Sequence, residues 1–106
     1  MYGIRVMVFA AALTAGSCFA FAAGDAAKGK EVFDQCVVCH NADSAEQKIG
    51  PGLKGLFKKA KLANGKAPTE TNVRAKIDEG GNGMPAYKDI LSDQEKNDVI
   101  AYLKTL

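Results

Sequence analysis

Apolar residues recur at the three- and four-residue spacings of a helix near both ends of the polar part of the chain. After Asp25, a residue type that caps helix N-termini, an apolar stripe runs to about Val38. Its members are Val32, Phe33, Cys36 and Val37. Near the C-terminus, Ser92 and Glu95 have the spacing of a capping box. The apolar residues that follow it at helical spacing are Val99, Tyr102, Leu103 and Leu106. We therefore predict one helix over about 25–38 and another from residue 92 onward.

Two shorter segments between these helices carry the same kind of pattern. An amphipathic turn follows Gly50-Pro51-Gly52 and contains Leu53, Leu56 and Phe57. Val73 and Ile77 lie one helical turn apart, with Thr69 or Thr71 as the cap and Gly80-Gly81 as the end of the helix. No stretch shows the sustained alternation of apolar and polar residues that a strand requires. The sequence predicts an all-α fold of three to five helices.

The first 22 residues have the pattern of a cleaved secretory signal peptide. Arg5 is the only charged residue before Asp25, residues 6–15 are apolar, and Ala20-Phe21-Ala22 has the A-x-A form of a cleavage site. Two alternatives stay open. The uncharged run over 6–24 is long enough for an uncleaved membrane anchor, and residues 15–18 weakly match a lipoprotein box ending at Cys18. We predict a signal peptide over 1–22 and a periplasmic protein, with membrane anchoring as the alternative.

The remaining residues, 23–106, have room for one globular domain. Of the 106 residues, 47% are hydrophobic and 25% charged, and the formal charge is +2. The first two values exclude a disordered or fibrous chain, and the third argues against a nucleic-acid binder. A short secreted domain without tryptophan forms a modest core, and such domains usually add a disulfide, a metal or a cofactor. The soft ligands available after residue 22 are Cys36, Cys39, His40 and Met84.

The sequence Cys36-Val37-Val38-Cys39-His40 is a C-x-x-C-H motif, the attachment sequence for c-type haem. Cysteines three residues apart lie on one helical face, so both thiols reach the same porphyrin edge while the imidazole binds iron. Three alternatives fit less well. Zinc lacks a fourth Cys or His ligand, a thioredoxin-like pair lacks its βαβ context, and a disulfide between these cysteines closes too small a loop to stabilise the fold. We predict one haem c, covalently bound through Cys36 and Cys39, with His40 as an iron ligand.

Met84 is the expected second axial ligand of the iron. It lies in Gly83-Met84-Pro85, an irregular stretch after a glycine-rich turn, rather than on a helical stripe where methionine fills a core. His/Met ligation is the arrangement of cytochromes c, and the thioether raises the reduction potential. Lys88 or a water molecule are the alternative ligands.

On these residues the chain resembles the class I c-type cytochromes, the small monohaem periplasmic kind. The similar segments are 24–29, 36–40, 50–57, 84–85 and 100–104. The resemblance implies helices wrapped around one covalently attached haem, with the N- and C-terminal helices crossing. Residue by residue, it implies that Gly29 and Phe33 pack against Val99 and Tyr102. It also implies that the carbonyl of Pro51 accepts a hydrogen bond from the proximal histidine, which orients the imidazole. Between Phe57 and Met84 the similarity fades, and no Trp or Arg stands where many members bind a haem propionate.

An iron bound by both His40 and Met84 has no position open to substrate, so the sequence indicates an electron carrier and not an enzyme. We predict a monomeric periplasmic one-electron carrier that meets redox proteins and approaches a membrane only transiently, through those partners. The alternative is a haem enzyme or ligand sensor in which Met84 leaves the iron.

The segment from Lys48 to Lys66 contains lysines and no acidic residue. A short basic run of this kind often serves only solubility. Steering by charge favours the fast, short encounters of an electron carrier. We therefore predict that an acidic redox partner docks through Lys54, Lys58, Lys59 and Lys61.

Overall fold

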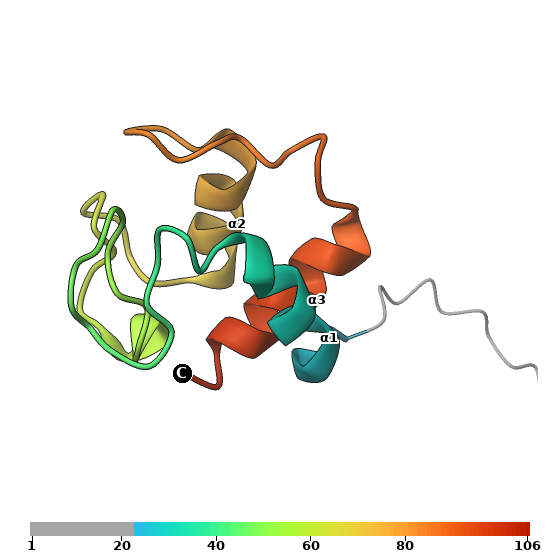
Figure 1. Cartoon of the computed structure of the whole chain (residues 1–106), viewed down its shortest axis with the longest axis horizontal. Coiled ribbons are helices and arrows are strands. Elements are labelled where there is room, and N and C mark those ends of the chain that lie inside the picture. The colour runs from blue at the N-terminus through green and yellow to red at the C-terminus, as the bar shows by residue number, and fades with distance from the viewer. Residues whose placement is uncertain (1–22) are drawn as a thin grey trace, which may run out of the picture.

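The computed structural model describes residues 23–106, and the predicted signal peptide and Cys18 lie outside these residues. The chain forms three α-helices, α1 (Ala26–Val32), α2 (Glu70–Glu79) and α3 (Asp93–Leu103). Two short 3-10 helices, η1 (Phe33–Gln35) and η2 (Leu56–Lys58), complete the regular structure (Figure 1). The described part contains no β-strand, so the all-α prediction is confirmed. Within residues 23–106, no helix is long and apolar enough to cross a membrane.

The helices begin at the residues that the sequence predicts. The Asp25 carboxylate accepts hydrogen bonds from the amides of Ala27 and Lys28, at 2.9 and 3.2 Å. Thr69, rather than Thr71, caps α2. The capping box of Ser92 and Glu95 is complete, because each side chain binds the other residue's amide. These side chains satisfy amides that the first turn of a helix leaves without partners.

The first helix is shorter than predicted. Its α-helical part ends at Val32 and tightens into η1, and residues 36–39 form turns instead of continuing the helix to Val38. The amide of Cys36 donates to the carbonyl of Phe33, at 2.7 Å, over the three-residue span of a 3-10 turn. The β-branched pair Val37-Val38 also disfavours a further α-turn. The apolar stripe extends beyond Val32, where the α-helix changes into a 3-10 helix, and it therefore does not mark the end of the α-helix.

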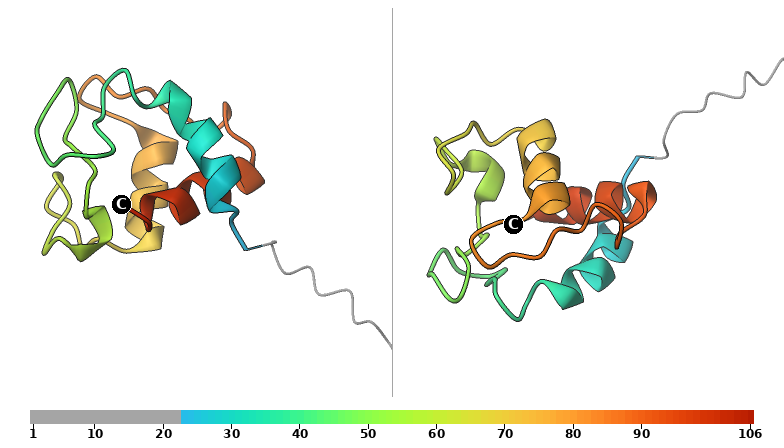
Figure 2. Two further views of the ribbon diagram at one scale, coloured as in Figure 1. Left: turned by 60° about the horizontal axis from the view of Figure 1, so that its bottom comes forward. Right: turned by 90° about the horizontal axis from the view of Figure 1, so that it is seen from above.

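α1 and α3 cross, as Figures 1 and 2 show, and Gly29 lies at their contact. A Cβ atom on Gly29 would overlap the backbone carbonyl of Asp98 and lie 2.8 Å from the Cβ of Tyr102. Beside this contact, the rings of Phe33 and Tyr102 are tilted by 54° with centroids 5.3 Å apart. The amide of Asp25 donates to the Asp98 carboxylate, at 2.8 Å. The predicted crossing of the terminal helices is confirmed.

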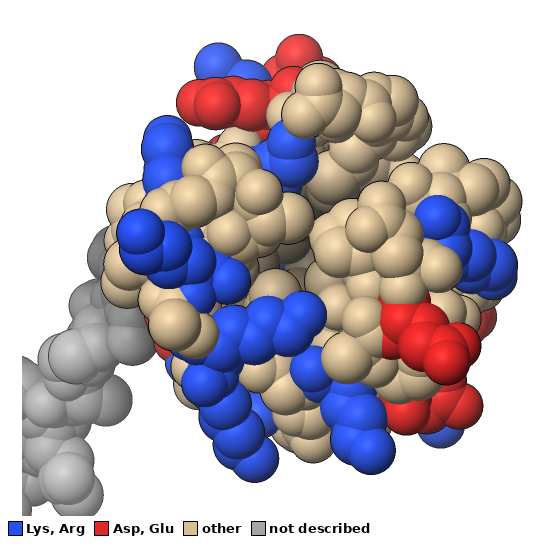
Figure 3. Space-filling view, turned by 90° about the vertical axis from the view of Figure 1, so that its left-hand side faces the viewer, with Lys and Arg blue, Asp and Glu red and all other residues tan. Residues whose placement is uncertain are grey.

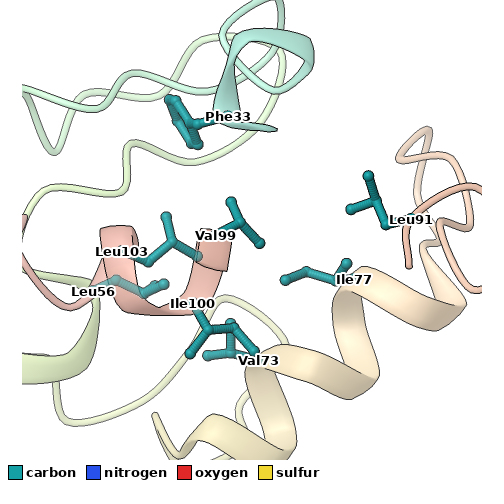
Figure 4. Packing of buried hydrophobic residues seen from close by; sticks show 8 residues of the cluster. All are labelled: Phe33, Leu56, Val73, Ile77, Leu91, Val99, Ile100 and Leu103. Carbon is teal, nitrogen blue, oxygen red and sulfur yellow. The ribbon is translucent and has the colours of Figure 1, made fainter. Parts of the chain in front are cut away.

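The buried core lies between α3, η1, α2 and the long loops. Figure 4 shows its apolar side chains pointing into one region from all of these elements. They are Phe33, Leu56, Val73, Ile77, Leu91, Val99, Ile100 and Leu103. Because α2 is joined to α1 and to α3 by long connections, loops form a large part of the surface around this core (Figure 2).

Candidate functional site

The residues of the C-x-x-C-H motif occupy the turns that follow η1. The amides of Cys39 and His40 both donate to the carbonyl of Cys36, at 3.1 and 2.9 Å. The two thiols are free and partly buried, while Val37 and Val38 between them are 42 and 64% exposed. The turn thus directs the two sulfur atoms inward and the two valines toward solvent.

The Cys36 thiol stays protonated over the physiological pH range. Burial, and to a smaller extent the neighbouring Cys39, raise its pKa from 9.0 to about 11. A neutral thiol is a poor metal ligand and a slow partner in disulfide exchange. The environment of Cys36 therefore favours neither of these two reactions.

His40 is oriented by the segment Gly50-Pro51. Its Nδ1 lies 2.7 Å from the carbonyl oxygen of Pro51, and because a carbonyl only accepts, Nδ1 carries the proton and donates. The other ring nitrogen, Nε2, keeps its lone pair for a metal. Gly50 packs against the ring so closely that a Cβ atom there would lie 2.6 Å from Cε1 of His40. The sequence shows a Gly-Pro-Gly turn, but only the structure reveals that Gly50 is the surface on which the imidazole rests.

Met84 lies on a closed loop between α2 and α3. Gly81 and Met84 exchange two backbone hydrogen bonds, at 2.9 and 3.1 Å. Gly80 ends α2 with φ +62°, and a Cβ atom there would be 2.6 Å from the carbonyl oxygen of Pro85. Only glycine tolerates both this backbone conformation and this approach. Met84 itself is partly buried and packs against the core.

The loop that carries Met84 and the turn that carries Cys36 pack against the same core cluster. Burial raises the pKa of Tyr87, and the charges that Cys36 and Cys39 carry as thiolates would raise it further. Tyr87, three residues after Met84, packs against the same core cluster as Cys36. The sequence did not indicate this shared contact, because no local spacing connects residues so far apart.

The donor groups fit haem better than they fit a bare metal ion. Among residues 23–106 no three His, Cys, Asp or Glu side chains converge on one point, which disfavours the zinc alternative. The motif supplies two thiols and an imidazole with a free Nε2, and the apolar side chains of Figure 4 suit a flat apolar ring. Phe33 lies three positions before Cys36 in the chain, and Leu91 and Ile77 flank the Met84 loop.

The lysines of 48–66 lie on the loops between η1 and α2 and fall into two groups. Lys48 and Lys59 donate from Nζ to backbone carbonyls, to Val37 at 2.9 Å and to Gly52 at 3.2 Å. The others extend into solvent: Lys54, Lys58, Lys61 and Lys66. Figure 3 faces the side of the molecule that these loops form, and it shows many basic side chains there, with the acidic ones nearer the edges of the view.

Comparisons with known proteins point to one family. The sequence profile of the Cytochrome c family matches residues 26–106. Cytochrome c2 of Blastochloris viridis is 35% identical, covering 95% of this chain and 93% of that protein. Cytochrome c6 of Leptolyngbya boryana is 39% identical, over 74% of this chain and 89% of its own.

Solved structures show the same similarity. Cytochrome c6 from the diatom Phaeodactylum tricornutum superposes with a TM-score of 0.59 at 32% identity, covering 77% of this chain and 93% of that one. Cytochrome cH from Methylobacterium extorquens gives a TM-score of 0.57 at 27% identity, over 78% and 100% of the two chains. The profile spans the cysteine turn, the Met84 loop and both crossing helices, and the chain belongs to the cytochrome c family.

Proposed function

We propose that this protein is a periplasmic one-electron carrier with one haem c, bound through Cys36 and Cys39 and ligated by His40 and Met84. The observation that carries the proposal is the 2.7 Å contact between His40 Nδ1 and the Pro51 carbonyl, which leaves the lone pair of Nε2 available in the residue that follows Cys39. Haem, when bound, supplies an iron that cycles between the ferric and ferrous states. The named relatives, cytochromes c2 and c6, support the same class of function.

In this function the chain would restrain the two proposed iron ligands, His40 and Met84, in a fixed orientation. Pro51 holds the imidazole through Nδ1 and increases its basicity toward a metal at Nε2. Gly50 limits rotation of the ring from one side. On the other side of the proposed site, the two backbone hydrogen bonds between Gly81 and Met84 restrain the backbone that carries the thioether. A carrier needs the same ligand geometry in both oxidation states, because any rearrangement slows electron transfer.

The test is the variant Met84→Ala in the haem-loaded protein. We expect the haem to stay attached, the fold to persist, the reduction potential to fall, and exogenous imidazole to bind far more readily than in the wild type. The wild-type ferric protein should show the weak red absorption band that accompanies methionine ligation, and the variant should lack it. A wild type without this band would favour the alternative, a haem enzyme or sensor with an open iron position. Lys88→Ala is the matched control, because Lys88 is the other candidate ligand on the loop.

We further propose that the exposed lysines, above all Lys54 and Lys58, steer acidic redox partners. Lys59 is a weaker candidate, since its ammonium holds the carbonyl of Gly52. Exposed charges act on the encounter rate through long-range attraction, which salt screens.

Replacing both Lys54 and Lys58 by glutamate tests this proposal with small charged reagents. At low salt, oxidation by ferricyanide, an anion, should slow and oxidation by a cationic cobalt complex should speed up. Both changes should fade as the Debye length falls to about 10 Å at 0.1 M ionic strength. The variant Lys28→Glu/Lys30→Glu on α1 changes the net charge equally. Equal rates for the two double variants would show that only total charge matters.

A further inference from the structure

The Met84 loop is closed at its base on one end of α2. The chain leaves α2 at Gly80 and returns after Met84, where the amide of Tyr87 donates to the carbonyl of Ile77, at 2.9 Å. The next amide, that of Lys88, donates to the carbonyl of Asp78, at 3.3 Å. The returning chain is therefore fastened to the last turn of α2 by two backbone hydrogen bonds, the second one long.

A buried lysine on α3 joins the same place. Lys96 is only 4% exposed, and its Nζ donates to the carbonyl oxygen of Lys88, at 3.0 Å. The same ammonium lies 2.8 Å from Oδ1 of Asp78 and 3.9 Å from a carboxylate oxygen of Asp93. One charged group thus connects α3, the last turn of α2 and the returning end of the loop.

The arrangement around Lys96 depends on that single charge. Oδ1 of Asp78 is inaccessible to solvent and accepts no aligned hydrogen bond, so its contact with Lys96 is an ion pair without good hydrogen-bond geometry. Without the ammonium, a buried carboxylate oxygen and the Lys88 carbonyl would both lose a partner. Leaving such groups unpaired costs more than their contact contributes when it is made.

We propose that Lys96 is a positioning residue for Met84: it fastens the base of the loop and so keeps the thioether on the iron. The inference rests on the proposed function, in which Met84 is the ligand. A ligand that displaces Met84 requires the loop to move away, and the closed loop is the state in which Lys96 holds the Lys88 carbonyl. Removing Lys96 lowers the free energy of the open loop relative to the closed one, and the open population rises.

Lys104 offers a matched comparison on the same helix. It also bridges α3 to α2, through an ion pair with Glu70, but both side chains are about half exposed and no loop residue takes part. An exposed pair of this kind contributes little to stability. Lys96→Met and Lys104→Met therefore remove the same charge and the same type of bridge, and only the first acts on the loop.

The experiment measures imidazole binding to the ferric, haem-loaded variants and the hydrogen exchange of individual amides. For Lys96→Met we expect imidazole to bind about tenfold more tightly than to the wild type, and for Lys104→Met a change of less than about twofold. The amides of Tyr87 and Lys88 should exchange faster in Lys96→Met, while those of α1 should not change. Lys96→Arg, which retains charge and donors, should restore part of the wild-type affinity.

Asp78→Asn keeps the proposal testable if Lys96→Met fails to fold. It weakens the hold on the ammonium but leaves the Lys88 contact, so imidazole affinity should rise by a smaller factor. A Lys96→Met protein of lower stability but wild-type imidazole affinity would overturn the proposal, and so would unchanged affinity in Asp78→Asn. Failure of the proposed Met84 ligation would be seen separately, as a wild type that lacks the methionine-dependent absorption band.

Discussion

The crossing of α1 and α3 and the pair of loops that carry His40 and Met84 are held by different kinds of contact. At the crossing, side chains and backbone meet directly: Gly29 lies against Asp98, and Phe33 lies against Tyr102. At the loops, individual side chains donate hydrogen bonds to backbone carbonyls and so hold the loops in place. His40 donates to Pro51, and Lys96 donates to Lys88. Close packing resists small displacements, whereas an isolated hydrogen bond contributes little net stability. The crossing is therefore the more closely packed of the two regions, and the loops hold the proposed ligand residues His40 and Met84 by fewer contacts.

The largest effect should come from removing both thiols. In Cys36→Ala/Cys39→Ala we expect no covalently retained haem and a chain that is largely unfolded or molten at room temperature, because a small domain depends on the ring for much of its core. Far-UV circular dichroism and a thermal melt measure this, with the wild-type holoprotein beside it. Native helicity with a sharp transition would mean that both regions fold without the ring.

A substitution at the crossing should damage its packing without touching the ligands. In Gly29→Ala the new methyl group would overlap the Asp98 carbonyl, and the helices must separate. We expect a loss of about 1–3 kcal/mol in the free energy of unfolding by guanidinium, with the reduction potential nearly unchanged. Lys30→Ala, exposed on the same helix, is the control. A gain of about 1 kcal/mol in the free energy of unfolding, the effect of replacing glycine by alanine in an exposed helix, would show that the crossing accommodates the methyl group.

The smallest effect concerns the carboxylate of Asp98 and its pH dependence. The pKa of Asp98 lies below its usual 3.8, first because the Asp25 amide donates to it and then because of the Gln94 amide. Since the folded-state pKa is lowered, this stabilisation is complete above about pH 4 and is lost as the pH falls through the folded value. Asp98→Asn should cost about 1 kcal/mol at pH 7.

Thermal midpoints between pH 3 and 7 measure this difference. The difference in thermal midpoint between the wild type and Asp98→Asn should shrink below pH 4, because Asp98 of the wild type then becomes protonated and uncharged. Asp89→Asn, at an exposed position, should run parallel to the wild type. A constant gap across the whole range would mean that Asp98 acts by packing and not by charge.

Much of the fold follows from local spacing. Asp25, Thr69 and the pair Ser92/Glu95 cap helices where the sequence places them, because a cap involves residues only two or three positions apart. The C-x-x-C-H motif is equally local. The end of the first helix was misjudged, since an apolar stripe looks the same whether the backbone continues as an α-helix or tightens into a 3-10 turn.

By itself, the sequence determined the helical class, the C-x-x-C-H motif and the two residues, His40 and Met84, that are proposed to face the iron. Only the tertiary structure decided that Gly50 lies against the imidazole and that Lys96 is buried beneath the Met84 loop. Gly50 lies ten positions after His40, and α3 meets the loop only after the chain has turned back. Lysine on a helix normally points to solvent, so its burial depends on an ion pair with Asp78 and a carbonyl brought from another segment. Contacts of this kind have no period along the chain, and they exist only once the helices have packed.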